Sequence, residues 1–362
     1  MEELDAWLGL LQCPDCQSGL EADAGSAERL SCRGCGRIFE RSRGIWNLLP
    51  SVISNVEGKD AEKEGWQQKS EEDKRTGWTP PPEFYLALPY VEHHYYTPAA
   101  RYLDIVLEYG KPWLGKKVLE LGAAECWATR HFAEAGSDAV GLDYDDDKDR
   151  MGKAQILLDH LPIHFLRVKG DGECVPFKAN TFDCIFCVSV IHHFFDLPRA
   201  AMEISRTLKP GGVLFAIHEA FHPPYWTEER ALAWNEENSI NLEVGINERS
   251  YTAGFYRKLF RKAGLKLDVI TPRWDVRHEG SSLIVKPGAG IFANRHYVPE
   301  MLNSRSERKD LVGWIARLLL ASQVWRIAVS PLVFPLIRFQ LLNWMQRPKI
   351  IVARKPTPSG GG

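Results

Sequence analysis

The chain has 362 residues, of which 44% are hydrophobic and 25% are charged, a composition that suits one large or two to three ordinary globular domains. Its 45 Lys and Arg residues are balanced by 47 Asp and Glu residues. The chain therefore lacks the overall excess of basic residues that is typical of nucleic-acid-binding proteins. The first residues contain no basic segment followed by an apolar stretch, so we expect no secretory signal. The expected location is therefore cytoplasmic, with contact with a membrane surface as an alternative, and the eight cysteines are expected to stay reduced.

Four of the cysteines lie in the first 50 residues, in two closely spaced pairs. Each pair is a C-x2-C motif and 15 residues separate the pairs, a spacing typical of zinc ribbons. Two such turns can direct four thiolates to one tetrahedral ion, and four protein ligands leave no open position for catalysis. The sequence therefore predicts a structural Zn2+, which would also stabilise a block of residues 1–50 that is too small to fold on its hydrophobic core alone. The predicted ligands are Cys13, Cys16, Cys32 and Cys35.

Residues 51–94 are polar and interrupted by prolines. This composition predicts a linker between domains, or a mobile lid anchored by Trp66 and Trp78. Its last part overlaps a stretch with a helical pattern over 83–110, for which Gly110 is the predicted C-cap.

From residue 116 onward, short apolar runs alternate with amphipathic segments. This alternation predicts an α/β fold with a doubly wound parallel sheet and helices on both faces. A further C-x2-C motif, from Cys184 to Cys187, lies within one strand, where positions i and i+3 face opposite sides, so we expect two buried core thiols there. Strands are expected at residues 116–122, 138–144, 163–171, 182–190, 213–219, 265–271 and 348–356.

The segments KVLELGAAECWATRHFA and GDGECVPF, followed by IHH and LPRAAMEISRTLKPGG, resemble the class I S-adenosylmethionine (SAM)-dependent methyltransferases. The resemblance covers residues 95–272 and 348–356, and it implies a seven-stranded Rossmann-like sheet whose last strand is antiparallel. The N-terminal block, with CPDC, CRGC and a closing Leu-Leu-Pro, also resembles the zinc ribbon that precedes many bacterial methyltransferases. A related arrangement occurs in certain ribosomal-RNA guanine methyltransferases, so the ribbon does not identify the acceptor.

The resemblance also implies which residues bind the cofactor. The methionine end of SAM would lie at the first strand–helix turn, the ribose hydroxyls at the acid that ends the second strand, and the adenine amino group at the acid that ends the third. The family's acidic-x-Gly-x-Gly-x-Gly motif reads Glu-Leu-Gly-Ala-Ala-Glu-Cys in this chain, and this departure bears on cofactor affinity. The implied residues are Glu120, Gly122 and Ala124 for the methionine end, Asp143 for the ribose, Asp171 with Gly172 and Glu173 for adenine, and Ser189 facing the methionine end.

Several histidines follow the fourth and fifth predicted strands, whose ends are expected to flank the transferred methyl group. An oxygen or nitrogen acceptor often needs a base near neutral pH, which a histidine can supply. The predicted acceptor-side residues are His192, His193, His218, Glu219 and His222, with His93, His94, Tyr95 and Tyr96 as a weaker set.

The string HEAFH at residues 218–222 matches the H-E-x-x-H motif of zinc metalloproteases. That motif requires a helix, whereas this string ends a predicted strand and runs into Pro223 and Pro224, which disfavour a helical His222. In an extended chain His218 and His222 would lie roughly 13 Å apart, too far to share a metal ion. We therefore predict no protease site.

Residues 273–347 interrupt the strand–helix alternation and are predicted to form an apolar helical insert before the last strand. From residue 311 to the C-terminus there are seven Lys or Arg and no Asp or Glu. The longest uncharged run, 327–337, is shorter than the ~20 residues that cross a membrane. Two alternatives remain for 311–347: a cap that lines an apolar substrate pocket, or contact with an anionic membrane surface.

Together these features favour a SAM-dependent methyltransferase that acts on a small-molecule or lipid-linked acceptor, such as a sugar or a secondary metabolite. One alternative is an RNA methyltransferase that binds RNA through the zinc ribbon, which the balanced charge disfavours. The other is a non-catalytic, methyltransferase-like binding protein, for which the altered glycine motif is the support.

Overall fold

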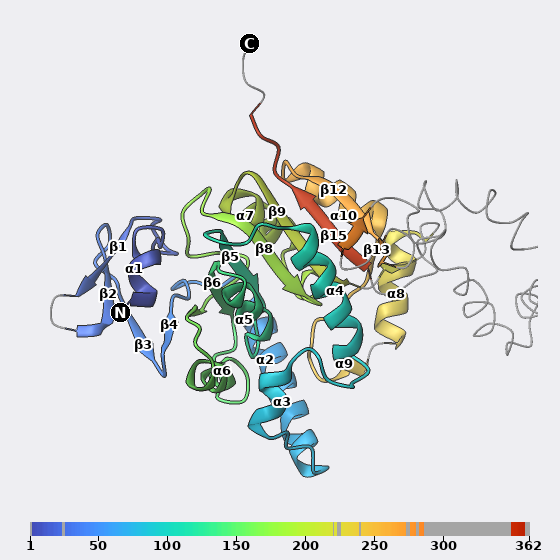
Figure 1. Ribbon diagram of the computed structural model, residues 1–362, viewed down its shortest axis with the longest axis horizontal. Coiled ribbons are helices and arrows are strands. Elements are labelled where there is room, and N and C mark those ends of the chain that lie inside the picture. Colours follow the sequence, from blue (N-terminus) through green and yellow to red (C-terminus); the bar gives the residue numbers. More distant parts are fainter. Residues whose placement is uncertain are drawn as a thin grey trace, which may run out of the picture. The chain divides into compact units, whose positions relative to one another are not determined.

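The computed structural model describes residues 2–23, 26–219, 221–222, 226–238, 240–272, 276–279, 282–285 and 349–358 (Figure 1). The chain divides into two compact units, one formed by Met1–Val269 and Ile350–Gly362 and the other by Ile270–Lys349. In the second unit, β13 (Val276–Glu279) and β14 (Ser282–Val285) form an antiparallel pair. The apolar stretch 311–347 of the predicted insert lies outside the described residues. Within the described residues, no helix is both long and apolar enough to cross a membrane.

An eleven-stranded sheet forms the centre of the first unit, in the order β1-β2-β3-β4-β7-β6-β5-β8-β9-β15-β12 (Figure 1). The strands from β4 to β9 in this order are all parallel to their neighbours, so the predicted α/β fold with a parallel sheet is confirmed. The strands of this sheet that follow residue 116 are β5 (Lys117–Leu121), β6 (Asp138–Asp143), β7 (Leu166–Lys169), β8 (Phe182–Val188), β9 (Leu208–Glu219), β12 (Lys266–Ile270) and β15 (Lys349–Arg354).

The sheet has more strands than the seven predicted because the N-terminal block extends its edge. The block's strand β4 (Ile45–Asn47) pairs in parallel with β7, with Trp46 opposite Val168. Without β4, the edge of β7 would expose unpaired backbone N–H and C=O groups. The remaining elements of the block are α1 (Glu2–Leu8), β1 (Leu20–Asp23), β2 (Ser26–Cys32) and β3 (Ile38–Ser42).

The helices beside the sheet bury one apolar face each, as α7 (Leu197–Thr207) illustrates. Asp196 caps this helix by accepting a hydrogen bond from the backbone N–H of Arg199. Leu197, Ala201 and Ile204 recur at helical spacing and are buried. The other main helices of this kind are α4 (Tyr96–Tyr109), α5 (Trp127–Glu134), α6 (Ala154–His160) and α10 (Ala253–Lys262).

The continuous helical stretch predicted over 83–110 is wrong, because two helices, α3 (Pro82–Ala87) and α4, occupy this region. Pro89 lies between them and has no backbone N–H to continue a helix. The predicted C-cap is confirmed, since the N–H of Gly110 donates to the carbonyl of Val106. The predicted core thiols Cys184 and Cys187 are likewise both buried.

The region 51–94, predicted as a linker or mobile lid, contains the longest helix of the described residues, α2 (Val56–Arg75). Its sequence has no apolar stripe at helical spacing, so the hydrophobic pattern did not reveal it. The helix buries polar groups instead, including the side chain of Lys59. It also packs closely at Gly65, where an added Cβ would lie 2.4 Å from the carbonyl oxygen of Val244.

Candidate active site

Three carboxylates lie at the carboxyl ends of three neighbouring parallel strands. Glu120 is on β5, Asp143 ends β6, and Asp171 follows β7. The register of the sheet brings these ends to one edge, since Asp143 is opposite Lys169, the last residue of β7. Open parallel sheets bind ligands at this edge, where the loops after the strands diverge.

Glu120 is buried and bound to the start of α5. Its Oε2 accepts a hydrogen bond from the backbone N–H of Thr129 at 2.6 Å and another from the hydroxyl of Thr129. Burial raises the pKa of Glu120 to about 8, because the ionised carboxylate is poorly solvated there. A positively charged ligand beside Glu120 would favour its ionised form.

The turn between β5 and α5 adopts left-handed backbone at every second residue, with φ of +64° at Gly122, +43° at Ala124 and +59° at Cys126. The backbone conformation that glycines favour is therefore kept at all three motif positions, at a strain of about 1–2 kcal/mol for each non-glycine residue. Cys126 fits because Gly141 on β6 has no side chain: a Cβ there would lie 2.8 Å from Cys126 Sγ. The N–H of Ala124 donates to Oδ2 of Asp143 at 2.8 Å and ties the turn to β6.

Asp143 is buried, and burial raises its pKa despite the nearby positive charge of Arg150. Its Oδ1 accepts the backbone N–H of Asp145 at 2.9 Å. The guanidinium of Arg150 lies over the ring of Trp66, 5.0 Å from its centroid. The Nε of Arg150 is buried and has no hydrogen-bond partner among the described residues. The sequence pattern did not single out Arg150, because it follows an acidic loop and belongs to no motif.

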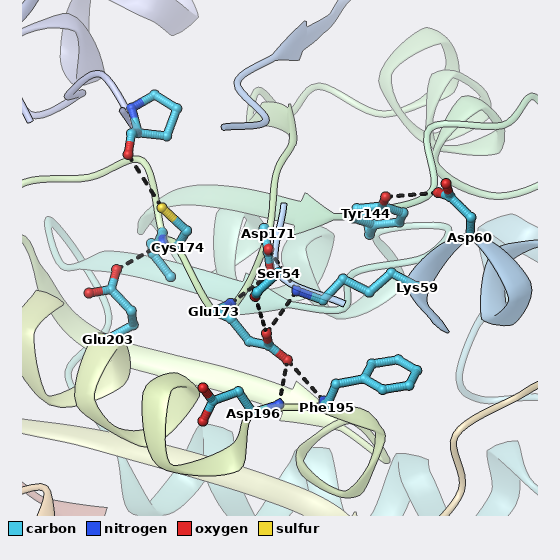
Figure 2. Close-up of polar contacts among 12 residues, drawn as sticks. Ser54, Lys59, Asp60, Tyr144, Asp171, Glu173, Cys174, Phe195, Asp196 and Glu203 are labelled. Atoms are coloured by element: carbon cyan, nitrogen blue, oxygen red, sulfur yellow. Dashed lines mark hydrogen bonds and ion pairs between the residues drawn. The ribbon is translucent and has the colours of Figure 1, made fainter. Parts of the chain in front are cut away.

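Asp171 is paired with a lysine from α2 (Figure 2). Lys59 Nζ lies 2.7 Å from Oδ2 of Asp171 and 2.8 Å from Oε2 of Glu173, and all three side chains are buried. The N–H of Glu173 donates to Oδ1 of Asp171 at 2.9 Å. The acid predicted to read adenine therefore already accepts two hydrogen bonds, and two lone-pair positions remain for a ligand.

Glu173 is more fully engaged than Asp171. Besides Lys59, its carboxylate accepts hydrogen bonds from the hydroxyl of Ser54 and from the backbone N–H groups of Phe195 and Asp196 (Figure 2). Four donors satisfy both oxygens, so Glu173 joins the start of α2 to the start of α7. Gly172, beside Glu173, allows the ring of Phe194 to pack closely against the backbone, since an added Cβ would lie 2.6 Å from that ring.

His192 and Glu219 form a buried ion pair, with Nδ1 of His192 2.6 Å from Oε2 of Glu219. Oε1 of Glu219 accepts the backbone N–H groups of Val190 and Ile191 at 3.0 Å each. Burial opposes the charge on both groups, but each partner offsets it: Glu219 raises the pKa of His192, and His192 lowers that of Glu219. These contacts fix the loop after β8 against the end of β9.

His218 and Ser189 face each other across the ends of β9 and β8. The Oγ of Ser189 lies 3.2 Å from Nδ1 of His218, and both residues have positive φ, +53° and +63°. The ring of His218 packs against Tyr95 at 4.8 Å and Tyr102 at 6.2 Å between centroids. Burial lowers the pKa of His218 to about 4, so this imidazole is neutral at pH 7.

The four weaker candidates for the acceptor side, which precede β5 in the chain, fall into two groups in the structure. Tyr95 joins the residues above, whereas His93, packed on His94 and Tyr96, stacks on the ring of Trp78 at 6.2 Å between centroids. The structure therefore places Tyr95 beside a predicted site residue and His93 in an aromatic cluster on the α3–α4 side.

His193 lies against α2, and its partner was not predicted. Nδ1 of His193 is 2.9 Å from Oε1 of Glu62, and its ring centroid is 6.0 Å from that of Trp66. Burial lowers the pKa of His193 to about 3 and raises the pKa of Glu62 to about 7. No motif marked Glu62, because it is one of many acids in a polar segment.

His222 lies in β10 (Phe221–His222), which pairs with β11 (Tyr251–Thr252) outside the main sheet. It is buried, its Nε2 is 3.0 Å from Oδ1 of Asn235 on α8 (Glu228–Asn238), and its ring stacks on Trp226. His218 and His222 thus belong to different strands, in line with the expectation that HEAFH is no helical zinc motif. Short helix α9 (Ile240–Glu243) follows α8 in the chain.

The four N-terminal cysteines converge, with their Sγ atoms within 4.8 Å of one another. The Cys16–Cys32 and Cys13–Cys35 pairs are 3.3 Å and 3.8 Å apart, close to the edges of a tetrahedron with Zn–S bonds of about 2.3 Å. The geometry of these thiols therefore fits a zinc ion. Among the described residues, this is the one group of metal-ligating side chains with such convergence.

Comparisons with known proteins agree with this geometry. A family model for a methyltransferase domain matches residues 119–216. A sterol 24-C-methyltransferase of Schizosaccharomyces pombe is 30% identical over 132 residues, which are 36% of this chain and 34% of that protein. A demethylmenaquinone methyltransferase of Renibacterium salmoninarum is 30% identical over 111 residues, 31% of this chain and 44% of that protein. The chain thus spans less than half the length of these curated relatives.

Among solved structures, the YcgJ protein of Bacillus subtilis superimposes with a TM-score of 0.44 and 17% identity, covering 71% of this chain and 99% of that chain. The matched segment 119–216 runs from β5 to β9 and contains Glu120, Asp143 and Asp171. Residues 119–216 of this chain therefore match a methyltransferase domain.

Proposed function

We propose that the protein transfers a methyl group from SAM to a small, largely apolar acceptor. The observation that carries the proposal is the set of three carboxylates at the ends of β5, β6 and β7, beside a turn whose backbone keeps the left-handed geometry of the family's glycine motif. SAM would supply an electrophilic methyl group on a sulfonium, and the protein would position the two reactants.

Three residues would hold the cofactor. Glu120 would face the positively charged methionine end, where a cation favours its ionised form. Asp143, held by the N–H groups of Ala124 and Asp145, would accept the ribose hydroxyls. Asp171 would accept the adenine amino group while Lys59 balances its charge. We assign Glu173 to structural support, because four protein donors already occupy its carboxylate.

The acceptor side would be formed by the ends of β8 and β9 and by α2. Tyr95, Tyr102 and Trp66 offer aromatic surface there, and His193 and His218 are neutral at pH 7. Such a lining suits an apolar acceptor with one or two polar groups. The names of the curated relatives point to acceptors of this class, a sterol and demethylmenaquinone. Ser189 would lie between cofactor and acceptor, and Glu219 would hold His192 in place.

Two further parts of the proposal concern the rest of the chain. The four cysteines would hold a structural Zn2+ that orders the N-terminal block. For the stretch 311–347, which lies outside the described residues, the two alternatives are an apolar cap and contact with an anionic membrane surface, and either would suit an apolar or lipid-linked acceptor.

Calorimetry with S-adenosylhomocysteine tests the cofactor site. Asp143→Asn should weaken binding roughly tenfold or more, as expected when a charged hydrogen-bond acceptor is lost. Asp138→Asn is the matched control, because this acid lies at the opposite end of β6, paired with Lys117 at the surface, and should leave affinity unchanged. If the wild-type protein does not bind S-adenosylhomocysteine, the proposal fails.

Transfer of tritium from [methyl-3H]SAM tests the acceptor class. The probes are reduced demethylmenaquinone, a sterol, catechol and purified ribosomal RNA. Label in one of the small molecules supports the proposal. Label confined to the RNA would refute the acceptor class and favour the RNA methyltransferase alternative.

A further inference from the structure

The face of α2 that meets the sheet carries charged and aromatic residues at helical spacing. Lys59, Glu62, Lys63 and Trp66 follow the i, i+3, i+4, i+7 pattern that places side chains on one face. Lys59 reaches Asp171, and Lys63 lies 3.7 Å from a carboxylate oxygen of Asp145. Asp60 accepts a hydrogen bond from the hydroxyl of Tyr144 at 2.9 Å (Figure 2). The contacts on both sides hold Glu62 in a fixed place on the acceptor side.

Glu62 and His193 form a close pair in this protected position. Oε1 of Glu62 is 2.9 Å from Nδ1 of His193, and their side chains are 16% and 15% exposed. Nδ1 of His193 makes no regular hydrogen bond to any group in the described part of the chain, so Glu62 is the group placed to engage it. Asn247 holds the backbone of His193 in place, since its Nδ2 donates to the carbonyl of His193 at 2.8 Å.

The surroundings keep this pair uncharged or singly charged. Burial, followed by the nearby charge of His192, lowers the pKa of His193, while burial raises the pKa of Glu62 to about 7. The other charged groups that face the pair are Arg150, Glu219 and Glu248. A buried imidazole alone is a weak base, because its cation is poorly solvated. A carboxylate at Nδ1 stabilises that cation when it forms, as in other carboxylate–histidine pairs.

We propose that Glu62 is a positioning residue that orients His193, and that His193 is the general base for an acceptor bearing a hydroxyl or amine hydrogen. The proposal rests on the proposed methyl transfer. A lone pair of the acceptor oxygen or nitrogen attacks the methyl carbon, the carbon–sulfur bond breaks, and its electron pair stays on sulfur. The acceptor's proton moves to Nε2 of His193, while Nδ1–H donates to Glu62. The products are the methylated acceptor, S-adenosylhomocysteine and a proton that later leaves to water.

This arrangement also explains why α2 lies where it does. Glu62 is on the helix and His193 follows β8, so the two meet when α2 is docked on the sheet. Removing α2 would leave His193 without its carboxylate partner, so the imidazolium that forms when the acceptor proton is taken up would lose its stabilising negative charge.

The test compares Glu62→Gln with Glu64→Gln in the full-length protein. Glu64 is on the same helix but exposed, so its substitution should change nothing. Glu62→Gln should bind S-adenosylhomocysteine within about twofold of wild type and lower kcat with the methylated probe by roughly 10- to 100-fold, within the usual contribution of general base catalysis. The rise of the wild-type rate with pH near 7 should disappear in Glu62→Gln, and His193→Ala should show the same loss.

A second measurement needs no acceptor. In protein labelled with 15N-histidine, the His193 ring resonances should titrate together with Glu62 between pH 5 and 9, and Glu62→Gln should change that titration. An identical His193 titration in wild type and Glu62→Gln, or an unchanged pH–rate profile, would overturn the proposal. Failure of the wild type to bind S-adenosylhomocysteine would instead refute the proposed function, so the two outcomes are distinguishable.

Discussion

Replacing Lys59 with methionine should release α2 from the sheet. Lys59 is buried, and its Nζ pairs with two buried carboxylates, Asp171 and Glu173, at 2.7 Å and 2.8 Å. Removing one partner of a buried ion pair typically costs about 3–5 kcal/mol, because the remaining charges are left unpaired in a poorly solvated site. Methionine keeps the length of the apolar stem, so the change removes mainly the charge.

Hydrogen exchange measures this effect locally. For Lys59→Met we expect the protection of amides in 56–75 to fall roughly 10²- to 10⁴-fold, since each 1.36 kcal/mol is a factor of ten in the opening equilibrium. Lys63→Met is the control: Lys63 lies one helical turn after Lys59, is 26% exposed, and has its Nζ 3.7 Å and 3.9 Å from carboxylate oxygens of Asp145 and Asp146. Such a pair contributes about 0–1 kcal/mol, so protection should fall less than about tenfold. Equal protection in the two variants would refute the view that Lys59 anchors α2.

Three further outcomes are expected. Metal analysis should find one Zn2+ per chain in wild type and in Cys184→Ser, and less in Cys16→Ser. A chelator should lower the Tm of wild type and of Cys184→Ser, and should leave that of Cys16→Ser nearly unchanged. The His192–Glu219 pair should stabilise the fold at pH values between the lowered pKa of Glu219 and the raised pKa of His192. The Tm of wild type should therefore fall as the pH rises through the folded pKa of His192, and this fall should be smaller in His192→Asn. Ala124→Gly, at φ +43°, should raise stability by about 1 kcal/mol in urea unfolding, whereas a decrease would show that the turn is not strained.

The parallel sheet could be predicted because its strands are buried on both faces and separated by amphipathic helices. The runs around Val118, Val140 and Ile185 show this pattern directly in the sequence. The extension of the sheet through β4 could not be predicted, because Ile45–Asn47 is a short strand whose pairing with β7 depends on tertiary contacts. The break at Pro89 was readable in principle, since proline interrupts a helix.

The residues of the candidate site also differ in whether the sequence could predict them. Glu120, Asp143 and Asp171 could be predicted because strand ends and a turn fix their positions in the chain. Glu62 could not, because its role arises from the contact of α2 with His193, 131 positions later in the numbering. Periodicity reveals a helix when one of its faces is apolar, and α2 buries Lys59 instead.

The polar face of α2 has a thermodynamic consequence. An apolar helix face would be held by the sheet whatever ligand was present, whereas α2 is held by Asp171, Asp145 and His193, groups that lie at the proposed cofactor and acceptor sites. A ligand that engages one of these groups changes the free energy with which α2 docks, and by linkage any change in that docking alters the affinity for the ligand by the same factor. Bound S-adenosylhomocysteine should therefore change the opening equilibrium of 56–75 in wild type, and Lys59→Met, which favours opening, should change the affinity for S-adenosylhomocysteine. A large change in one quantity with none in the other would show that α2 and the cofactor site are independent.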